Sequence, residues 1–312
     1  MGPWQAAHVR VAIIGNFDGV HRGHQALIRR ARQRASQDAP SRVIAVTFDP
    51  HPTAVLRPDR APAALTSTSR RTDLLLESGA DEVTVLHFTP EFAAASPEDF
   101  AHLLRDPDGI AADLVIVGAN FRFGQGAAGD TALLAELGAR LGFEVDVVPL
   151  EAQGPDDAPW SSSHARDCIE AGDLPGAADV LGRPHRIEGP VVRGDQRGRD
   201  LGYPTANVEV APGTALPPDG VYAGWLVVGG DPLPAAVSIG TNPQFNGRER
   251  RVEAYALDRD DLDLYGQTVA IDLIERLRGQ AVFASVADLQ SHMAADVSAT
   301  RQRLAAPGPS GG

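Results

Sequence analysis

The sequence of 312 residues contains no lysine, so all 28 of its basic residues are arginines. A Walker A loop needs its lysine to reach the nucleotide phosphates, and the protein-kinase nucleotide site needs one as well. The sequence therefore excludes both of these phosphate-binding arrangements. Any phosphate chemistry in this chain relies on arginine, histidine, backbone N–H groups or a metal ion.

Three other scarcities narrow the class of protein. The single cysteine, Cys168, can form neither an internal disulfide nor a paired-cysteine metal site. No apolar run approaches the ~20 residues of a membrane-spanning helix, and no secretory signal pattern is present at the first residues. Basic residues are outnumbered by 41 acidic ones, and the net charge of −13 disfavours a broad nucleic-acid or anionic-membrane surface. We expect a cytoplasmic protein that binds neither nucleic acid nor membrane, and self-association stays open.

Strand-like and helical segments alternate through the first half of the chain, and the helical segments lie at Arg22–Ser36 and near Ser69–Ser78, Pro97–Leu104 and Thr131–Leu141. This alternation of near-continuous apolar strands with helices predicts a doubly wound parallel α/β sheet. The strand-like runs are Val9–Gly15, Val43–Phe48, Val83–Phe88, Leu114–Gly118 and Glu144–Val148.

The character of the chain changes near Gly182–Pro184. Beyond it, short strand-like runs are punctuated by Gly and Pro, which suggests an antiparallel barrel or sandwich, closed by one helix from Val286 to Leu304. We expect a first domain at 1–182, a second at 183–306 and a disordered tail at 307–312. The strand-like runs of the second domain are Gly189–Arg193, Val221–Val228, Ala235–Ile239, Val252–Leu257 and Val269–Leu277.

Residues 15–24 read GNFDGVHRGH and connect the first predicted strand to the first predicted helix. Open parallel sheets bind ligands beyond the carboxyl ends of their strands, and helix N-termini attract anions. Gly19 and Gly23 let a phosphate approach the backbone. His21 and His24 face the same way on a starting helix and could donate hydrogen bonds to phosphoryl oxygens as charge develops. An isolated histidine pair is more often a surface feature, but the strand and the flanking glycines favour a site.

This segment resembles the HxGH signature of the nucleotidylyltransferases, and the longer phrase is similar to the adenylyltransferase module of bacterial bifunctional riboflavin kinase/FAD synthetases. VTFDPHP at 46–52 and VGANFRFG at 117–124 agree with that module, and SSSHAR at 161–166 stands in place of its SSTxxR motif, with Trp160 and Ser163 as departures. The resemblance implies a Rossmann-like fold and catalytic roles for His21, His24 and Arg166. It implies nucleotide or phosphate contacts for Gly15, Phe17, Asp18, Gly19, Gly23, Asn120, Ser162 and Ser163.

The SSSHAR segment also makes physical sense without the resemblance. Serines before a helix act as N-caps and can donate to phosphate oxygens. The guanidinium of Arg166 can bridge phosphate oxygens. Taken alone, the segment is more often a capped helix with a surface arginine.

Residues 194–207 read GDQRGRDLGYPTAN, a glycine-rich loop that runs into an extended segment. Pro204 keeps the residue before it out of helical conformation, and in an extended chain Thr205 and Asn207 point to the same side. A hydroxyl and an amide oxygen at that spacing suit a hard cation such as Mg²⁺, with phosphates completing its shell. Taken alone, such a segment is more often an ordinary polar turn.

This loop resembles the GRxLGxPTAN motif of riboflavin kinases. The resemblance implies that Thr205 and Asn207 hold a Mg²⁺–nucleotide complex, with phosphate contacts from Gly198, Arg199 and Gly202.

Glu253 lies in a strand-like run, RVEAYAL, in which alternation places it on the face opposite Val252 and Ala254. A carboxylate in a strand usually faces solvent. Residues 237–245, VSIGTNPQF, together with VEAYALD resemble the NPxF…VE pattern of riboflavin kinases, with Gln244 replacing the usual Thr. The resemblance implies that Glu253 is the base that takes a proton from the ribityl hydroxyl.

The resemblance covers residues 9–305 and implies a bifunctional enzyme with an α/β first domain and a β-barrel second domain. The second domain would phosphorylate riboflavin with ATP, and the first would adenylylate FMN with a second ATP, giving FAD and pyrophosphate. Mg²⁺ is implied at both sites. Three alternatives stay open: another nucleotidylyltransferase, a riboflavin kinase with an inactive first domain, and a non-enzymatic flavin sensor.

Overall fold

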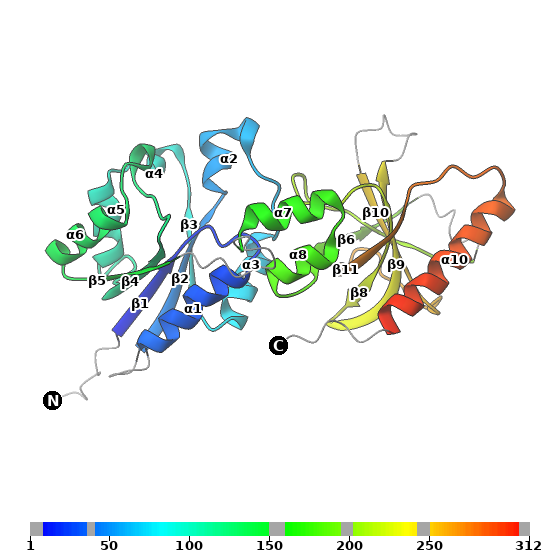
Figure 1. Ribbon diagram of the computed structural model, residues 1–312, viewed down its shortest axis with the longest axis horizontal. Coiled ribbons are helices and arrows are strands. Elements are labelled where there is room, and N and C mark those ends of the chain that lie inside the picture. Colours follow the sequence, from blue (N-terminus) through cyan, green and yellow to red (C-terminus); the bar gives the residue numbers. More distant parts are fainter. Residues whose placement is uncertain (1–8, 36–40, 150–159, 195–201, 242–249, 306–312) are drawn as a thin grey trace. The chain divides into compact units, whose positions relative to one another are not determined.

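The computed structural model describes residues 9–35, 41–149, 160–194, 202–241 and 250–305 (Figure 1). The contacts between Cα atoms divide the chain into two compact units, Met1–Ser162 and Ser163–Gly312. The expected domain boundary near Gly182–Pro184 lies further along the chain and stays a prediction, and the expected tail at 307–312 lies outside the described residues.

The first unit is built on a five-stranded sheet in which every strand pair is parallel and the order is β3-β2-β1-β4-β5. The predicted doubly wound parallel sheet is thereby confirmed. In this order the chain reverses direction across the sheet next to β1, where such folds open a crevice at the carboxyl ends of the strands. The strands are β1 (Val9–Ile14), β2 (Ser41–Asp49), β3 (Glu82–His87), β4 (Leu114–Gly118) and β5 (Glu144–Val148).

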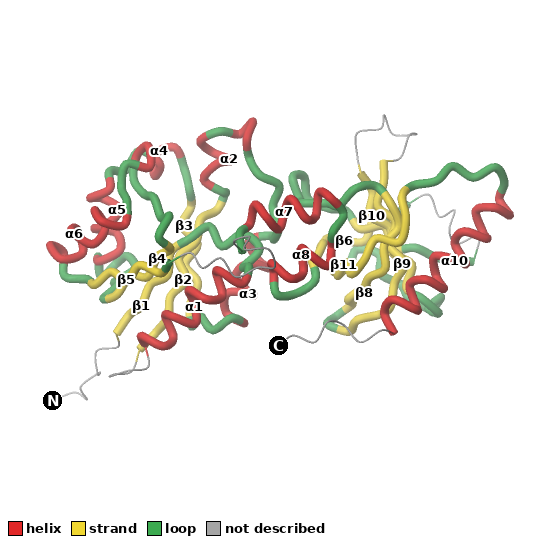
Figure 2. The backbone as a smooth tube through the Cα atoms, viewed as in Figure 1, coloured by secondary structure: helices red, strands yellow, loops and turns green. Residues whose placement is uncertain are grey.

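Helices pack on both faces of this sheet (Figure 2), because successive side chains of a strand point to opposite sides. In β1, Ile13 belongs to the apolar cluster that includes Ile28 of α1, whereas Ile14 belongs to the cluster that includes Leu104 of α5. Two cores, one on each face, fix the carboxyl ends of β1 and β4 in place. The helices are α1 (Arg22–Ala35), α2 (Pro52–Leu56), α3 (Thr68–Glu77), α4 (Pro90–Ala93), α5 (Pro97–Arg105) and α6 (Thr131–Leu141).

Capping residues set the ends of these helices. Ser96 and Asp99 form a reciprocal capping box at the start of α5, and the Asp130 carboxylate accepts the N–H of Leu133 at the start of α6. Gly142, in the left-handed conformation, ends α6. The predicted helices near 69–78, 97–104 and 131–141 accordingly agree with α3, α5 and α6 to within one residue at each end.

Helix α7 (Ser162–Ala171) begins at the last residue of the first unit, and the rest of it lies in the second unit. The second unit continues with α8 (Leu174–Leu181) and a closed barrel of order β10-β7-β6-β11-β8-β9, in which the strand pairs are antiparallel. The predicted barrel is confirmed, and α10 (Val286–Ala305) follows its last strand. The strands are β6 (His185–Val192), β7 (Ala206–Val208), β8 (Gly220–Val228), β9 (Asp231–Thr241), β10 (Arg250–Ala256) and β11 (Thr268–Gly279).

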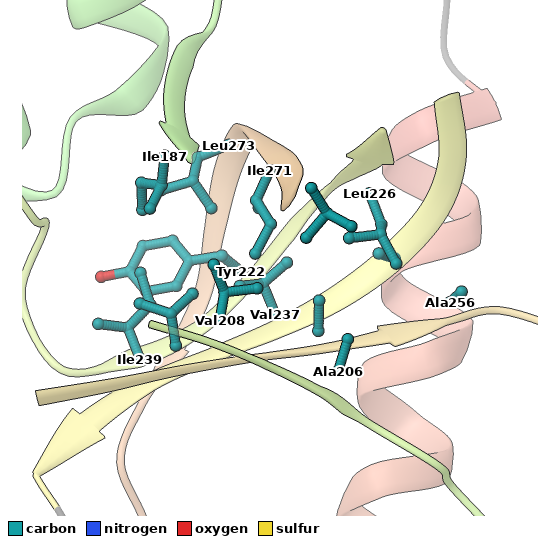
Figure 3. Close-up of a cluster of buried hydrophobic side chains, with 14 of the residues drawn as sticks. Ile187, Ala206, Val208, Tyr222, Leu226, Val237, Ile239, Ala256, Ile271 and Leu273 are labelled. Carbon is teal, nitrogen blue, oxygen red and sulfur yellow. The ribbon is translucent and has the colours of Figure 1, made fainter. Parts of the chain in front are cut away.

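Alternate side chains of the strands fill the barrel (Figure 3). Tyr222 is fully buried among them, and its hydroxyl donates to the carbonyl of Pro218. Leu174 of α8 belongs to the same apolar cluster, so this helix covers part of the barrel, alongside β6 and β11. Within the described ranges, no helix is long and apolar enough to cross a membrane.

Candidate active sites

The loop that follows β1 is held in a strained conformation by burial. Phe17 and Val20 have φ values of 51° and 39°, and Gly19 between them has 80°. Left-handed backbone is costly for residues other than glycine, above all for a β-branched one, and it persists only where the surroundings enforce it. Both side chains are fully buried, which supplies that enforcement. The ring of Phe17, expected at the nucleotide, lies in the core, edge-on to the His24 ring at 5.0 Å.

Asp18 fixes the same loop from the inside. Its carboxylate is 5% exposed and accepts the N–H groups of Leu65 and Thr66 and the Thr66 hydroxyl, each at 3.1 Å. The Thr66 hydroxyl in turn accepts the N–H of Gly19 at 3.2 Å. The Asp18 carboxylate is thus turned towards residues 65 and 66, and it shapes the loop that presents the neighbouring backbone.

His21 caps helix α1 and stacks on His24. The His21 Nδ1 accepts the backbone N–H of His24 at 3.4 Å, and the two ring centroids lie 3.6 Å apart with the planes inclined by 27°. An imidazole that accepts on Nδ1 carries its proton on Nε2 when neutral. The His21 ring therefore offers an Nε2–H donor at the N-terminus of α1, where the helix dipole also favours anions.

Gly15 and Gly23 are closely packed by their neighbours. A β-carbon on Gly15 would come within 3.2 Å of the Phe17 ring, and one on Gly23 would meet the His21 ring at 3.0 Å and the Trp160 carbonyl at 3.2 Å. Arg22 lies over the Trp160 ring at 5.7 Å, which is cation–π distance. The segment before α7 therefore lies directly against the histidine pair.

Arg71 of α3 is a residue of this site that the sequence analysis missed. Its guanidinium is 5% exposed and donates to the carbonyls of Asn16 and Phe48 at 3.0 Å each, so it joins the loop after β1 to the end of β2. Burial lowers the pKa of Arg71, and the carboxylates of Asp18 and Asp49 act in the opposite direction. The signal was present in the sequence, because Arg71 stands three and four residues before Leu74 and Leu75, on the apolar face of the helix.

Two further loops reach the same end of the sheet. His51, in the loop after β2, accepts the N–H of Thr53 on Nδ1, and its Nε2 lies 3.2 Å from the side-chain amide of Asn16. Asn120 follows β4, two residues beyond the strand, and is exposed. The carboxyl ends of β1, β2 and β4 thus bring Asn16, His51 and Asn120 to one edge of the sheet, as the strand order requires.

The serine motif straddles the boundary between the two units. The Ser162 hydroxyl donates to the Asp18 carbonyl at 2.8 Å, which ties the start of α7 to the loop after β1. Ser163 is exposed and Arg166 is half-buried on α7, both in the second unit. Their approach to the histidine pair stays a prediction. On the same helix, burial raises the pKa of the Cys168 thiol, and the carboxylates of Asp173 and Asp167 add to that effect.

A second group of polar residues lies on the outer face of the barrel. Ala206, Val208, Val252 and Ala254 point into the core, which turns Asn207 and Glu253 outward. Asn207 and Glu253 are direct partners in the β7–β10 register. The Thr205 hydroxyl lies 3.5 Å from Glu253 Oε2, the limit of a hydrogen bond. The structure therefore brings together the three residues for which the sequence predicts metal binding and proton transfer.

An aromatic pair and a glycine surround this group. Tyr203 and Tyr255 meet edge-to-face with their ring centroids 5.2 Å apart. Tyr203 stands two positions before Thr205 in the sequence, and Tyr255 two positions after Glu253. Gly194 lies against the side chain of Asn207, a contact the sequence analysis missed. Gly202 is exposed and left-handed at φ 85°. Gly198 and Arg199, two predicted phosphate contacts, lie outside the described residues, as does Gln244.

The chemistry of the donors fits a magnesium ion. A threonine hydroxyl and an asparagine amide oxygen are hard oxygen ligands of the kind that Mg²⁺ prefers, usually together with phosphate oxygens of the substrate. Among the described residues there is no group of three or more His, Cys, Asp or Glu side chains that could hold a metal. A magnesium ion at this face would accordingly share its ligands between the protein and a nucleotide.

Two family models match this chain, one over each of the two groups of motifs. Residues 4–163 match the family model for FAD synthetase, and residues 181–304 match the model for riboflavin kinase. Residues 164–180, which include most of α7 and all of α8 except its last residue, fall between the two matches.

Similar proteins align with nearly the whole chain. A protein of Escherichia coli K12 described as a bifunctional riboflavin kinase/FMN adenylyltransferase is 35% identical, over 94% of this chain and 92% of its own. One of Pseudomonas fluorescens with the same description is 36% identical, over 95% and 93%. A crystal structure described as a macrolide-efflux protein from Streptococcus pneumoniae superimposes with a TM-score of 0.82 at 30% identity and covers 94% of each chain.

Proposed function

This chain belongs to the bifunctional riboflavin kinase/FMN adenylyltransferase family, and on that premise we propose which of its residues carry out each reaction. The enzyme transfers the γ-phosphoryl group of ATP to riboflavin, giving FMN. It then transfers the adenylyl group of a second ATP to FMN, giving FAD and pyrophosphate. The outer face of the barrel serves the first reaction, and the edge of the sheet beside His21 serves the second.

Glu253 is the general base of the kinase. Removal of the proton from the terminal ribityl hydroxyl makes its oxygen a better nucleophile towards the γ-phosphorus, and a positioned carboxylate accelerates such a transfer typically ~10²–10⁴-fold. The observation that carries this assignment is the meeting of Glu253 with Thr205 and Asn207 on one face, although 46 residues separate Asn207 from Glu253 in the sequence.

Thr205 and Asn207 hold the Mg²⁺ that accompanies ATP at the kinase site. Both side chains point to the same outer face, and their oxygens are suitable ligands. A magnesium ion bound there would neutralise charge that develops on the transferred phosphoryl group. Gly198, Arg199 and Gly202 contact the phosphates in this proposal. The two glycines have no side chain and let a phosphate approach the backbone closely. Mg²⁺ also accompanies ATP at the first site.

His21 and His24 stabilise charge on the phosphates of the second ATP as the FMN phosphate attacks its α-phosphorus. The Nε2–H of His21 and the N-terminus of α1 supply donors that are already in place, so little reorganisation is needed during the reaction. Arg166, Ser162, Ser163 and Asn120 complete the phosphate contacts. Gly15, Gly19 and Gly23 keep the backbone accessible, while Phe17 and Asp18 hold it in shape.

Neither reaction requires a covalent enzyme intermediate, since in each step an oxygen of one substrate attacks phosphorus of the other. Catalysis then consists of positioning and charge stabilisation. A cytoplasmic location is part of the same proposal and rests on the sequence alone, whereas self-association stays open.

Complementation between two variants tests the assignment of the sites. We expect Glu253→Gln to make little FMN but to convert supplied FMN into FAD, and His24→Ala to make FMN but little FAD. A mixture of the two proteins should then carry riboflavin through to FAD. The flavins are separated by chromatography after incubation with riboflavin, ATP and Mg²⁺. If both variants lose both activities, the residues serve folding and the assignment fails.

The same incubation separates the alternatives. A riboflavin kinase with an inactive first unit would accumulate FMN and leave it unconverted. The retention of His21, His24 and Arg166, and the preorganised donor of His21, favour an active first unit. A different nucleotidylyltransferase would adenylylate another phosphorylated acceptor and would have no use for the group formed by Thr205, Asn207 and Glu253.

A further inference from the structure

Gly194 lies so close to Asn207 that no side chain fits between them. A β-carbon built on Gly194 would fall within 2.5 Å of Asn207 Cγ and Oδ1 and closer still to Nδ2. Contacts below 3.0 Å are essentially never made by real β-carbons. The φ of Gly194 lies outside the left-handed region that disfavours alanine. Glycine is required here for space and not for conformation.

The barrel explains why these two residues meet. Val192, near the end of β6, pairs with Asn207 of β7 in the strand register. Gly194 follows two residues later, where the chain leaves the strand, and its backbone lies against the end of the Asn207 side chain. The opposite neighbour of Asn207 is Glu253 of β10. Asn207 is accordingly flanked by backbone on one side and by the carboxylate on the other.

We propose that Gly194 is a positioning residue of the kinase, which holds the amide of Asn207 in the orientation that binds Mg²⁺. The inference rests on the proposed metal-binding role of Asn207. A bare backbone at Gly194 limits the rotation of the amide and leaves its oxygen available, whereas any larger residue displaces it. Groups that orient a metal ligand from outside the ligand set typically change metal affinity by ~10–100-fold when they are altered.

An alanine at this position should spare the fold and impair the site. The atoms that it meets are the terminal atoms of a half-buried side chain on the outer face of the barrel, which can rotate away without moving the backbone. The cost then appears in the orientation of Asn207 and not in the packing of the core. Conversion of FMN to FAD by the same chain reports on whether the protein is intact.

The test is a double-mutant cycle in the full chain, with the initial rate of FMN formation measured across a Mg²⁺ titration and the dissociation constant of Mg²⁺–ADP measured by calorimetry. The proteins are the wild type, Gly194→Ala, Asn207→Ala, the double variant, and Gly279→Ala as a matched control. Gly279 lies at the end of β11 in the same barrel, is not left-handed, and leaves 3.7 Å between an added β-carbon and Arg276 Nη2. We expect Gly194→Ala to raise the half-saturating Mg²⁺ concentration about 10-fold, with the riboflavin KM unchanged, and Gly279→Ala to match the wild type.

Non-additivity decides whether Gly194 acts through Asn207. If it does, adding Gly194→Ala to Asn207→Ala changes the rate no further. An equal loss in both backgrounds, or a lower rate without a shift in the Mg²⁺ profile, would overturn the inference. Where Asn207→Ala is too slow to compare, the Mg²⁺ profile of Gly194→Ala alone decides. The Asn207→Ala variant tests the proposed metal-ligand role of Asn207 separately. A Mg²⁺ profile identical to that of the wild type in this variant would refute that role.

Discussion

Asn207 stands directly opposite Glu253 across strands β7 and β10, with the side chains of both on the outer face of the barrel. Directly opposed residues of an antiparallel pair have their β-carbons about 4.5–5.5 Å apart. The proposed ligand of the Mg²⁺ ion and the proposed base for the attacking hydroxyl are therefore close enough to serve one phosphoryl transfer. Because the two proposed roles differ, substitutions at the two positions should impair FMN formation in different ways.

Glu253→Gln keeps the shape of the side chain but cannot accept the proton. We expect the kcat of riboflavin phosphorylation to fall by ~10²–10⁴-fold, with little change in the Mg²⁺ requirement. Steady-state FMN formation at saturating ATP measures this, and conversion of supplied FMN to FAD is the internal control. A near-normal kcat would rule out the general-base role.

Asn207→Asp adds a negative charge beside Glu253 and beside the proposed ion. Like charges that oppose each other across a strand pair destabilise it, and an anionic ligand binds Mg²⁺ differently from an amide. We expect the half-saturating Mg²⁺ concentration for FMN formation to change, while FAD formation from FMN is preserved. A Mg²⁺ profile identical to that of the wild type would count against Asn207 as a ligand.

His21 has a structural role and a proposed catalytic one, and two substitutions separate them. His21→Ala removes both the acceptor that caps α1 and the Nε2–H donor, so it should cost about 0.5–2 kcal/mol of stability as well as activity. His21→Asn restores a capping acceptor but not the imidazole donor.

Thermal unfolding should then be closer to wild type for His21→Asn, while both variants lose about 100- to 1,000-fold in FAD formation. FMN formation from riboflavin is measured in parallel and should be unchanged. Recovery of FAD formation in His21→Asn to the wild-type rate would show that the histidine acts only as a cap.

Fragments that begin at different residues test the domain boundary. Leu174 is fully buried in the barrel cluster, and burial of such a side chain contributes about 1.5–3 kcal/mol. We expect a fragment of residues 163–312 to unfold at a higher temperature than one of residues 183–312, and both to make FMN if they fold. Circular dichroism and FMN formation measure the two properties. Equal unfolding temperatures would show that α8 adds nothing to the barrel.

The Cys168 thiol should be slow to react. Because its pKa is raised by burial and by nearby carboxylates, less thiolate is present at a given pH than in a free cysteine. Alkylation by iodoacetamide should therefore need a more alkaline pH than alkylation of a cysteine peptide, and unfolding in urea should remove the difference. Rapid alkylation of the folded protein at neutral pH would contradict this expectation.

Local patterns in the sequence were enough to predict most elements and the two folds. The apolar runs of β4 and β5 and the helical period of α6 depend only on neighbours along the chain, and their bounds coincide with the structure. The outward direction of Glu253 and Asn207 followed from simple alternation in extended chain. The short strand β7 was expected only as an extended segment, because three residues carry too little pattern to identify a strand.

What the sequence by itself determined was the order of the elements, the location of the two motif groups and the family they resemble. The tertiary structure decided the contacts between distant residues. These include the register that pairs Asn207 with Glu253, the approach of Gly194 to Asn207, the burial of Asp18 against Thr66, and the bridge from Arg71 to two strand ends. Such contacts depend on how a barrel closes and how a sheet orders its strands. Those outcomes follow from long-range hydrogen bonding and packing, because local periodicity does not specify which distant residues meet.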